Sequence, residues 1–508
     1  MLKIILVITV IYFTFQTNAS RILVVIPTPS YSHQSALWPI WKELSLRGHQ
    51  VTLATTDPIH DPKLVNLTEI NMHDMYNHQV LMDLHTQVPT ANVLKILELI
   101  YRIGDVTFDY PLSTFLKPLL KNESVFDLVI VENLVPEYLA FADLFNCPSV
   151  VISPFEVSST VYTALGNPFN PIAYPEMVLP FIGGQLSFRE RIISFLFSYL
   201  FYGYKMLAVS KRKILMQKYF GKEVRSVEKL WNDVDLLLIN TNPIINDIRP
   251  LGPNTITFGG ANHVLPPRPL PKDLQVYLDN AEEGCIYFSL GTNVKNSMMT
   301  NEKIHIIIDT LSELPYKILW KYDGTDIIDV PENIKLIPWA PQQDILRHPN
   351  VKLFITQGGM QSLEESVINH KPMVMLPMFA DQAANARRME HRGVSKTVPH
   401  KPLPRKEEFK SIVLEVIQNP KYKENIIKMA DLLLDQPETG TEKAVLWLEH
   451  ILRHNGGKHL RNPSLDMPIY EFYYLDVTAT ITLINFAIYK IISYTLKLFI
   501  KQNNSKKL

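Results

Sequence analysis

The sequence predicts an α/β protein built from two doubly wound, Rossmann-like domains that face each other across a cleft. Apolar runs of strand length recur between helical patterns, and they are continuous rather than alternating. Continuous apolar strands are typical of parallel sheets that are covered by helices on both faces. The pattern occurs twice, on either side of a proline-rich segment. In such folds ligands bind beyond the carboxyl ends of the strands.

The first half of the chain contains five predicted strands. They are RILVVIP (21–27), HQVTLATT (49–56), FDLVIVE (126–132), PSVVIS (148–153) and VDLLLIN (234–240). The first strand leads into a helix that begins near His33. We therefore expect His33 at the carboxyl end of a strand, facing the cleft.

The segment 66–120 departs from this pattern because it has few strand signals. It contains the histidines and methionines Met72, His73, Met75, His78, Met82 and His85. The histidine spacing does not give the i, i+4 arrangement of a zinc site on a helix. Methionines suit a pocket that accepts varied apolar ligands, and a membrane contact is a further alternative. We favour a plain helical surface.

The second half repeats the α/β pattern. Its predicted strands are GCIYFSLG (284–291), YKILWKY (316–322), NIKLIPW (333–339), VKLFITQ (351–357) and PMVMLP (372–377). Helices are predicted between strands, including Gln361–His370 and Ala383–Arg392.

A proline-rich segment separates the two halves. Four prolines fall between Pro266 and Pro271, and proline cannot join the interior of a sheet. Residues 258–271 are therefore predicted to be a semi-rigid linker between a domain at 20–257 and a domain at 272–465.

Composition excludes several classes of protein. The 508 residues are 46% hydrophobic, which is enough for a large core and argues against disorder. The 50 basic and 50 acidic residues give no net charge, so no global attraction to nucleic acid is expected. Cys147 and Cys285 are the two cysteines, which excludes a disulfide scaffold and a zinc ribbon.

Both ends of the sequence carry targeting signals. Residues 1–19 read as a secretory signal peptide, because one lysine and an apolar run precede small residues suited to cleavage. The alternative is a buried first strand and helix. The sequons at Asn66 and Asn122 fit a luminal body.

The segment 475–500 is apolar on average, and the basic tail 501–508 follows it. A single spanning helix with a cytosolic tail is the favoured interpretation. Lys490 and Lys497 lie within the stretch, where a lysine near mid-span costs about 2.5–3.5 kcal/mol. An amphipathic helix in the membrane interface is therefore the alternative.

The most informative stretch runs from Trp339 to Gln382. Gln357-Gly358-Gly359 forms a predicted turn between a buried strand and a helix that starts near Gln361 or Ser362. Glycines let the backbone approach a ligand, and a helix N-terminus offers free N–H groups, so a diphosphate could bind there. A purely structural capping role is the alternative for a glycine turn taken alone.

Polar and aromatic residues surround this turn. Trp339 closes the preceding strand, where it could stack on a planar base. Glu365 lies one turn into the helix, where its carboxylate could bind a ribose diol. Asp381 and Gln382 follow the next strand and could bind a polyhydroxylated group.

This stretch resembles the signature of the UDP-glycosyltransferases, of the animal membrane-bound branch, and is most similar to the insect UDP-glucosyltransferases. The resemblance extends over Gly259-Gly260, Pro269-Leu270-Pro271 and Phe288–Thr292, and it covers essentially the whole chain. It implies a GT-B glycosyltransferase fold, with the acceptor in the first domain and the UDP-sugar in the second. It also implies endoplasmic reticulum location, as a single-pass type I protein with a luminal catalytic body.

The resemblance assigns roles to the donor-site residues. Trp339, with Ala340 beside it, would stack on uracil, Gln342 would lie by the nucleoside, and Glu365 would bind ribose. The diphosphate would be surrounded by Gly291, Thr292, Gln357, Gly359, Gln361 and Ser362, and Asp381 and Gln382 would bind the sugar hydroxyls. Many family members carry histidine at the position of Gln357. Glutamine can donate a hydrogen bond but cannot carry charge.

The resemblance also supplies a catalytic pair. A lone histidine at His33 would usually be a polar residue at a helix start, but family members carry their general base at the matching position. Its usual partner is an aspartate, and Glu132 occupies that position at the end of FDLVIVE. A carboxylate there would orient the imidazole and stabilise the imidazolium. Glutamate adds a methylene, which changes the geometry.

These residues predict inverting transfer of a hexose, glucose by resemblance, from a UDP-sugar to a hydroxyl of a small lipophilic acceptor. The alternative is a catalytically weak, membrane-anchored protein that binds a UDP-sugar or a lipophilic ligand. Asp233-Val234-Asp235 has the form of a metal-binding motif, but we interpret it as the solvated start of a strand and expect no metal. The expected partners are the donor, the acceptor and a membrane, with a homo-oligomer possible and no nucleic acid.

Overall fold

The computed structural model describes residues 19–80, 93–121, 125–292, 299–324, 327, 329–399 and 403–505. The signal peptide apart from its last residue, Met82, His85, the sequon at 122–124 and the end of the basic tail lie outside the described residues. The chain divides into two compact units, with the boundary between Leu460 and Arg461.

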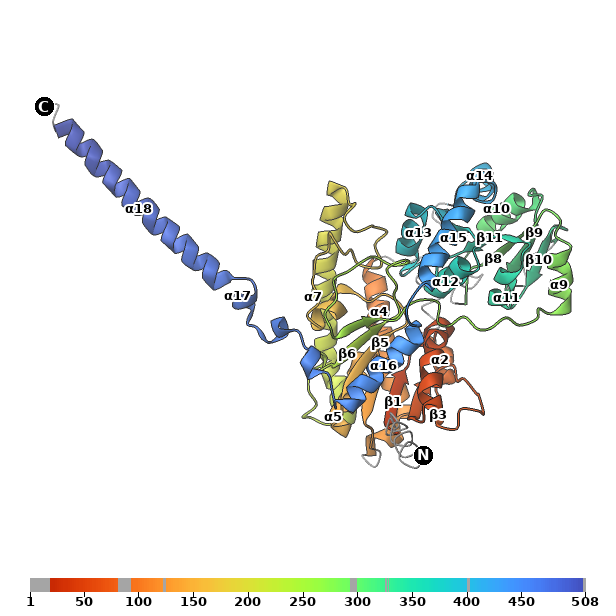
Figure 1. Cartoon of the computed structure of the whole chain (residues 1–508), viewed down its shortest axis with the longest axis horizontal. Helices are drawn as coiled ribbons and strands as arrows, with labels where there is room; N and C mark the ends of the chain where they lie inside the picture. The colour runs from red at the N-terminus through yellow and green to blue at the C-terminus, as the bar shows by residue number, and fades with distance from the viewer. Residues whose placement is uncertain are drawn as a thin grey trace, which may run out of the picture. The chain divides into compact units, whose positions relative to one another are not determined.

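The first unit contains two parallel sheets with helices on their faces (Figure 1). The first sheet has the strand order β3-β2-β1-β4-β5-β6-β7. Its strands are β1 (Arg21–Ile26), β2 (Gln50–Thr55), β3 (Leu67–Asn71), β4 (Leu128–Glu132), β5 (Ser149–Ser153), β6 (Leu236–Ile239) and β7 (Thr255–Thr257). The strand order reverses direction between β1 and β4, and such a switch point opens a crevice at the carboxyl ends of the strands.

Both faces of the first sheet are buried. Within β1, Leu23 and Val25 belong to one hydrophobic core, whereas Val24 and Ile26 belong to another. This alternation between two cores explains why the strands are apolar without interruption. The helices here are α2 (Tyr31–Leu46), α4 (Val93–Thr114), α5 (Ala140–Phe145), α6 (Ser159–Ala164), α7 (Phe188–Phe220) and α8 (Val227–Asn232).

The second sheet has the order β10-β9-β8-β11-β12-β13, again all parallel. Its strands are β8 (Cys285–Ser289), β9 (Lys317–Lys321), β10 (Ile334–Ile337), β11 (Val351–Thr356), β12 (Met373–Met375) and β13 (Ser395–Thr397). Its helices are α9 (Lys272–Asp279), α10 (Asn301–Ser312), α11 (Gln342–Arg347), α12 (Met360–Ile368), α13 (Gln382–His391), α14 (Lys406–Gln418) and α15 (Pro420–Leu434). The prediction of two parallel α/β sheets is confirmed.

The sequence pattern missed three strands. β3 lies in the segment 66–120, for which a helical surface was favoured, and its residues are only partly buried. An edge strand that is not buried on both faces lacks a continuous apolar run, so the pattern did not reveal it. β7 and β13 each have three residues, which is too short for a periodicity signal.

The linker is held against the second sheet's helical layer. The backbone N–H groups of Leu265 and Arg268 donate to the side chains of Gln343 and Asp344 at distances of 2.9 and 3.0 Å. Farther along the chain, α16 (Gly440–Arg453) lies within the range 272–465, yet it packs against α2 in the core that contains Ile26. The chain therefore returns to the first sheet before its end.

The second unit contains α17 (Ile469–Phe472) and α18 (Leu475–Ser505). The segment Leu475–Ile500 of α18 is long and apolar enough to cross a membrane.

Candidate functional site

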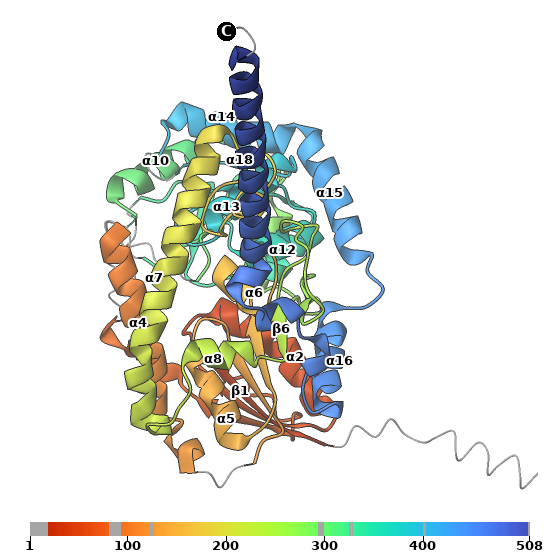
Figure 2. The same ribbon diagram turned by 90° about the vertical axis from the view of Figure 1, so that its left-hand side faces the viewer.

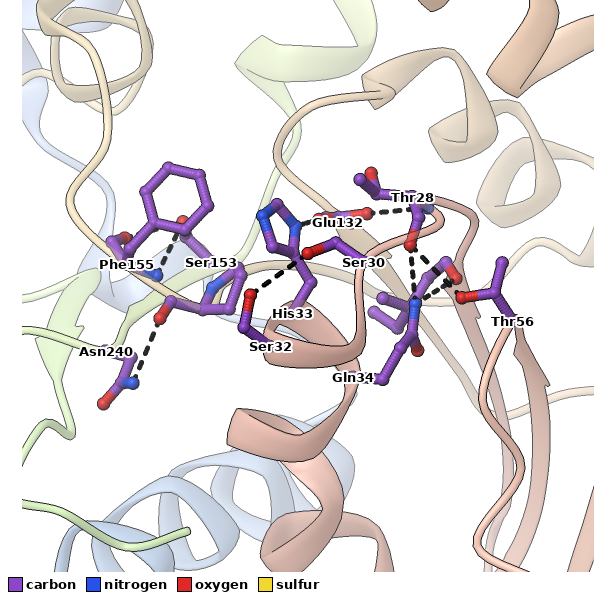
Figure 3. A network of polar contacts seen from close by, with 12 residues as sticks. Thr28, Ser30, Ser32, His33, Gln34, Thr56, Glu132, Ser153, Phe155 and Asn240 are labelled. Atoms are coloured by element: carbon purple, nitrogen blue, oxygen red, sulfur yellow. Dashed lines mark hydrogen bonds and ion pairs between the residues drawn. The ribbon is translucent and has the colours of Figure 1, made fainter. Parts of the chain in front are cut away.

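A histidine and a carboxylate meet at the switch point of the first sheet. Glu132 is the last residue of β4, which pairs directly with β1. His33 lies in the first turn of α2, which begins after the four-residue loop that follows β1. Nδ1 of His33 lies 2.7 Å from Oε1 of Glu132. Figure 3 shows the imidazole between Glu132 and the ring of Phe155, whose centroid lies 5.0 Å away. The side chain of Glu132 is one methylene longer than that of aspartate, and its carboxylate is within hydrogen-bond distance of the His33 imidazole.

Hydrogen bonds fix the loop between β1 and α2. The side-chain amide of Gln34 donates to the carbonyls of Ile26 and Thr28 at 3.1 and 2.9 Å. The hydroxyl of Thr55 donates to Gln34 Oε1 at 2.7 Å. The backbone N–H of Thr28 donates to Glu132 Oε2 at 3.3 Å, so both carboxylate oxygens are engaged (Figure 3).

This arrangement sets the tautomer of His33. An ionised carboxylate only accepts hydrogen bonds, so Nδ1 carries the proton that Glu132 accepts. Nε2 then carries a lone pair and has no hydrogen-bond partner among the described residues. His33 lines a cavity of about 630 Å³ into which this lone pair can act as a proton acceptor.

Every residue expected at the donor site lines this same cavity. These residues come from the carboxyl ends of the second sheet's strands and from the helices that follow: Gly291, Thr292, Trp339, Ala340, Gln342, Gln357, Gly359, Gln361, Ser362, Glu365, Asp381 and Gln382. The structure therefore brings His33 and all twelve of them to one cavity. Glu132 lies behind His33 and is fully buried.

Two glycines shape the turn before α12. Gly358 has a φ of 88°, and a Cβ there would lie 2.4 Å from Met375 Cε. Gly359 is the N-cap of α12. Gly359, Met360 and Gln361 line the cavity, so the first N–H groups of the helix lie beside it. Gln357 is buried, and its Oε1 has no hydrogen-bond partner among the described residues. An anionic oxygen beside the helix N-terminus would be bound by the Nε2 amide group of Gln357, because Oε1 can only accept hydrogen bonds.

Trp339 presents an aromatic platform at the edge of the cavity. It is 60% exposed, which is unusual for so large an apolar side chain. The ammonium of Lys321, at the end of β9, lies 4.7 Å from its ring centroid and donates to the carbonyl of Gly291 at 3.0 Å. Burial lowers the pKa of Lys321. The sequence patterns did not single out Lys321. A lysine at the carboxyl end of a buried strand could have indicated a residue of the ligand site.

The carboxylate of Glu365 is held by three side chains. Gln342 and Gln343 donate to it at 2.7 and 3.0 Å, and Nε2 of His263 lies 3.3 Å away. His263 is a buried residue of the linker, and its other nitrogen lies 3.4 Å from Glu364. Burial opposes the charge of the imidazolium, but the two carboxylates raise the pKa of His263 to about 10. These contacts in turn hold the pKa of Glu365 low despite its own burial.

Asp381 and Gln382 lie at the start of α13. Gln382 Oε1 accepts hydrogen bonds from the N–H groups of Met378 and Phe379, which fixes the loop after β12. The side-chain amide of Asn385 donates to Asp381 Oδ2 at 2.8 Å and to the carbonyl of Gly358 at 2.9 Å. Burial raises the pKa of Asp381.

The Asp-Val-Asp motif has a structural role. Asp235 accepts hydrogen bonds from the N–H groups of Ser149 and Gly457 at 3.0 and 2.6 Å, and Asp233 pairs with Arg225. Both aspartates lie at the amino end of β6, away from the cavity. Among the residues that the structure describes, no group of three or more His, Cys, Asp or Glu side chains is arranged to hold a metal ion.

Comparison with known proteins agrees with this geometry. A family model described as "UDP-glucoronosyl and UDP-glucosyl transferase" matches residues 21–507. The chain belongs to this family. UDP-glycosyltransferase UGT5 of Dactylopius coccus is 29% identical over 511 residues, which cover 97% of this chain and 96% of the relative. UDP-glucuronosyltransferase 2B7 of Homo sapiens is 29% identical over 484 residues, which cover 91% and 89%.

Two solved structures resemble the UDP-glycosyltransferase described here. The glycotransferase of kitacinnamycin has a TM-score of 0.58 at 18% identity, covering 85% of this chain and 98% of that one. Spinosyn forosaminyltransferase SpnP has a TM-score of 0.57 at 14% identity, covering 86% and 100%. Both are GT-B glycosyltransferases, so the predicted fold is confirmed. Because the relatives include glucosyl and glucuronosyl transferases, family membership establishes transfer from a UDP-sugar but leaves the sugar open.

Proposed function

We propose that this UDP-glycosyltransferase transfers glucose from UDP-glucose to a hydroxyl of a small lipophilic acceptor, with His33 as general base and with inversion at the anomeric carbon. The observation that carries the proposal is the His33–Glu132 pair, which lines the same cavity as the donor residues. The base comes from the first sheet and the leaving-group site from the second.

In this reaction Nε2 of His33 takes the acceptor's hydroxyl proton while the acceptor oxygen attacks the anomeric carbon. The bond from that carbon to the diphosphate breaks, and its electron pair leaves with UDP. Glu132 stabilises the imidazolium, as the carboxylate does in catalytic triads. Because base and leaving group lie on opposite sides of the sugar, attack occurs from the face opposite UDP and yields a β-glucoside.

The donor's negative charge is met by the protein itself. The N-terminus of α12, the amide of Gln357 and the ammonium of Lys321 are available for the diphosphate. Trp339 would stack on uracil on the face that Lys321 leaves open, and Glu365 would bind the ribose diol. The mechanism therefore needs no metal ion for leaving-group stabilisation.

Glucose is favoured over glucuronate by the charges at the sugar end of the cavity. Asp381 and Gln382 are placed there to bind hydroxyl groups. The basic residues that line the same cavity, Lys42, Arg268 and Lys321, come from α2, the linker and the end of β9, whereas the sugar end is assigned to Asp381 and Gln382 at the start of α13. Phe155, Met177 and Phe379, which line the cavity, also favour a lipophilic acceptor.

The proposed location is the membrane of the endoplasmic reticulum, with the catalytic body in the lumen and α18 as the single spanning helix. The full-length protein should resist carbonate extraction, whereas a chain that ends before Leu475 should not. If carbonate extracts the full-length protein, α18 does not span the membrane.

Release of UDP tests the proposed reaction. It should require both UDP-glucose and a phenolic acceptor, and UDP-glucuronate should support much slower release. His33→Ala is the matched control, since it should bind UDP normally but release UDP from the donor about 10²–10⁴-fold more slowly. UDP binding without acceptor-dependent release in the wild-type protein would favour a ligand-binding protein instead.

A further inference from the structure

The linker between the two sheets borders the donor site. The chain crosses between the sheets through the linker and again between α15 and α16, a connection that Figure 2 shows at the right-hand side. Of these two connections, the linker is the one whose described residues line the cavity, and His263 is among them. The carbonyl of His263 accepts a hydrogen bond from Nε2 of Gln343 at 3.4 Å, and the N–H of Leu265 donates to Oε1 of the same side chain. These contacts fix His263 against α11.

Both ring nitrogens of His263 face buried carboxylates. Nε2 lies 3.3 Å from Oε1 of Glu365, and Nδ1 lies 3.4 Å from Oε2 of Glu364. His263 is 7% exposed, Glu364 1% and Glu365 6%. An ionised carboxylate only accepts hydrogen bonds, so this placement suits an imidazolium with a proton on each nitrogen. One cation therefore lies between two carboxylates and offsets part of the cost of burying them.

The other contacts of Glu365 come from neutral amides. Nε2 of Gln342 donates to Oε2 at 2.7 Å, and Nε2 of Gln343 donates to Oε1 at 3.0 Å. Burial alone would raise the pKa of Glu365, and the contact with His263 contributes most to holding that pKa low instead. A protonated carboxyl would carry no charge and would have fewer sites for hydroxyl donors. The charge of the linker histidine therefore bears directly on what Glu365 can bind.

We propose that His263 is a positioning residue for the donor: its imidazolium keeps Glu365 ionised and oriented, so that this carboxylate accepts hydrogen bonds from the ribose hydroxyls of the UDP-sugar. The inference rests on the proposed binding of ribose by Glu365. It assigns to the linker a part in donor recognition, in addition to its part in joining the two sheets.

Another buried histidine provides a matched control in the same half of the molecule. His348, at the end of α11, is also 7% exposed, and its Nε2 lies 3.1 Å from Oδ1 of Asp279. His348 is not among the described residues that line the cavity. His348→Gln therefore makes the same substitution, with similar burial and a similar contact, away from the donor.

Nucleotides with and without ribose hydroxyls test the proposal. UDP and 2′,3′-dideoxy-UDP would be titrated calorimetrically into the full-length wild type, His263→Gln and His348→Gln. The wild type should prefer UDP by roughly 10–150-fold, as expected for a hydrogen bond to a charged acceptor. His263→Gln should lower this preference severalfold, because UDP binds more weakly while the dideoxy nucleotide binds almost as before. His348→Gln should keep the wild-type preference.

A second variant separates charge from shape. His263→Lys keeps a cation near the two carboxylates, so it should retain more of the preference for UDP than His263→Gln does. Equal losses in the two variants would show that the charge does not position Glu365. If the Gln variant does not fold, the Lys variant decides: a retained preference supports the proposal, and a lost one overturns it.

Three further results would overturn the inference, and they differ in what else they remove. A wild type that does not distinguish the two nucleotides would also refute the binding of ribose by Glu365. A wild type that distinguishes them, with the same preference in His263→Gln, would refute the role of His263 alone. A fall in affinity for both nucleotides by the same factor in His263→Gln would assign this histidine to the support of the fold.

Discussion

The two halves of the active site differ in how the chain supplies them. The donor half comes largely from one stretch, Trp339 to Gln382, which packs into consecutive strand–turn–helix units of the second sheet. The acid–base half joins His33 and Glu132, which are 99 positions apart in the sequence. A contiguous stretch leaves a readable motif, whereas a distant pair depends on which two strands become neighbours.

The two halves of the active site also differ in how many side chains support each functional group. Glu365 alone has three polar neighbours, and the glycine turn is tied to Asp381 through Asn385. The acid–base half has one imidazole and one carboxylate. We therefore expect single substitutions in the donor half to change affinity moderately, and those in the acid–base half to change turnover strongly.

The largest effect is expected at His33. His33→Ala removes the proton acceptor but no donor contact, so turnover with a phenolic acceptor should fall by about 10²–10⁴-fold. UDP-glucose affinity, measured by titration, should barely change. A variant that loses affinity and turnover together would place His33 in the donor half instead.

A smaller loss is expected at Glu132, because it acts through the histidine. Glu132→Gln removes the charge that stabilises the imidazolium, and Glu132→Asp keeps that charge with a shorter reach. Steady-state turnover should therefore follow the order wild type, Asp, Gln, His33→Ala. Equal activity of the Gln and Asp variants would show that the charge does not matter.

Trp339 tests the donor half. Trp339→Ala should weaken UDP binding by about 1–3 kcal/mol, by analogy with bases on aromatic platforms, while leaving the fold intact. Calorimetric titration with UDP measures this loss, and circular dichroism serves as its control. Unchanged affinity would remove the stacking assignment.

The smallest effect is expected from substitution of His263, and it should appear in the thermal stability of the folded protein. The folded-state pKa of about 10 lies above the ordinary value of 6.5, so the protonated imidazole stabilises the fold fully below about pH 6.5. That contribution is lost as pH rises toward 10. The thermal midpoint of the wild type should therefore fall more steeply between these values than that of His263→Gln. Parallel curves would contradict the raised pKa.

Sequence patterns predicted the features that depend on local order. Continuous apolar runs located β1, β4 and β5, and strand ends placed His33 and Glu132 at the cleft. The resemblance supplied the roles, because a lone histidine or a glycine turn has several structural interpretations. The prediction of a GT-B fold rested on both the apolar runs and the family resemblance.

Features that depend on packing between distant elements were not predicted. Lys321 reaches Trp339 because β9 and β10 are neighbours, and His263 reaches Glu365 because the linker folds against α12. The return of α16 to the first sheet is likewise a tertiary contact. Neither spacing nor propensity encodes which residues meet across such contacts.

A single-turnover experiment tests the central claim most directly. His33→Ala and the wild type would each be saturated with UDP-glucose and mixed with a phenolic acceptor, and sugar transfer from the bound donor would be followed. Equal donor occupancy with transfer slowed by about 10²–10⁴-fold in the variant is the predicted result. Transfer at the wild-type rate from the bound donor would contradict a mechanism in which His33 is the base.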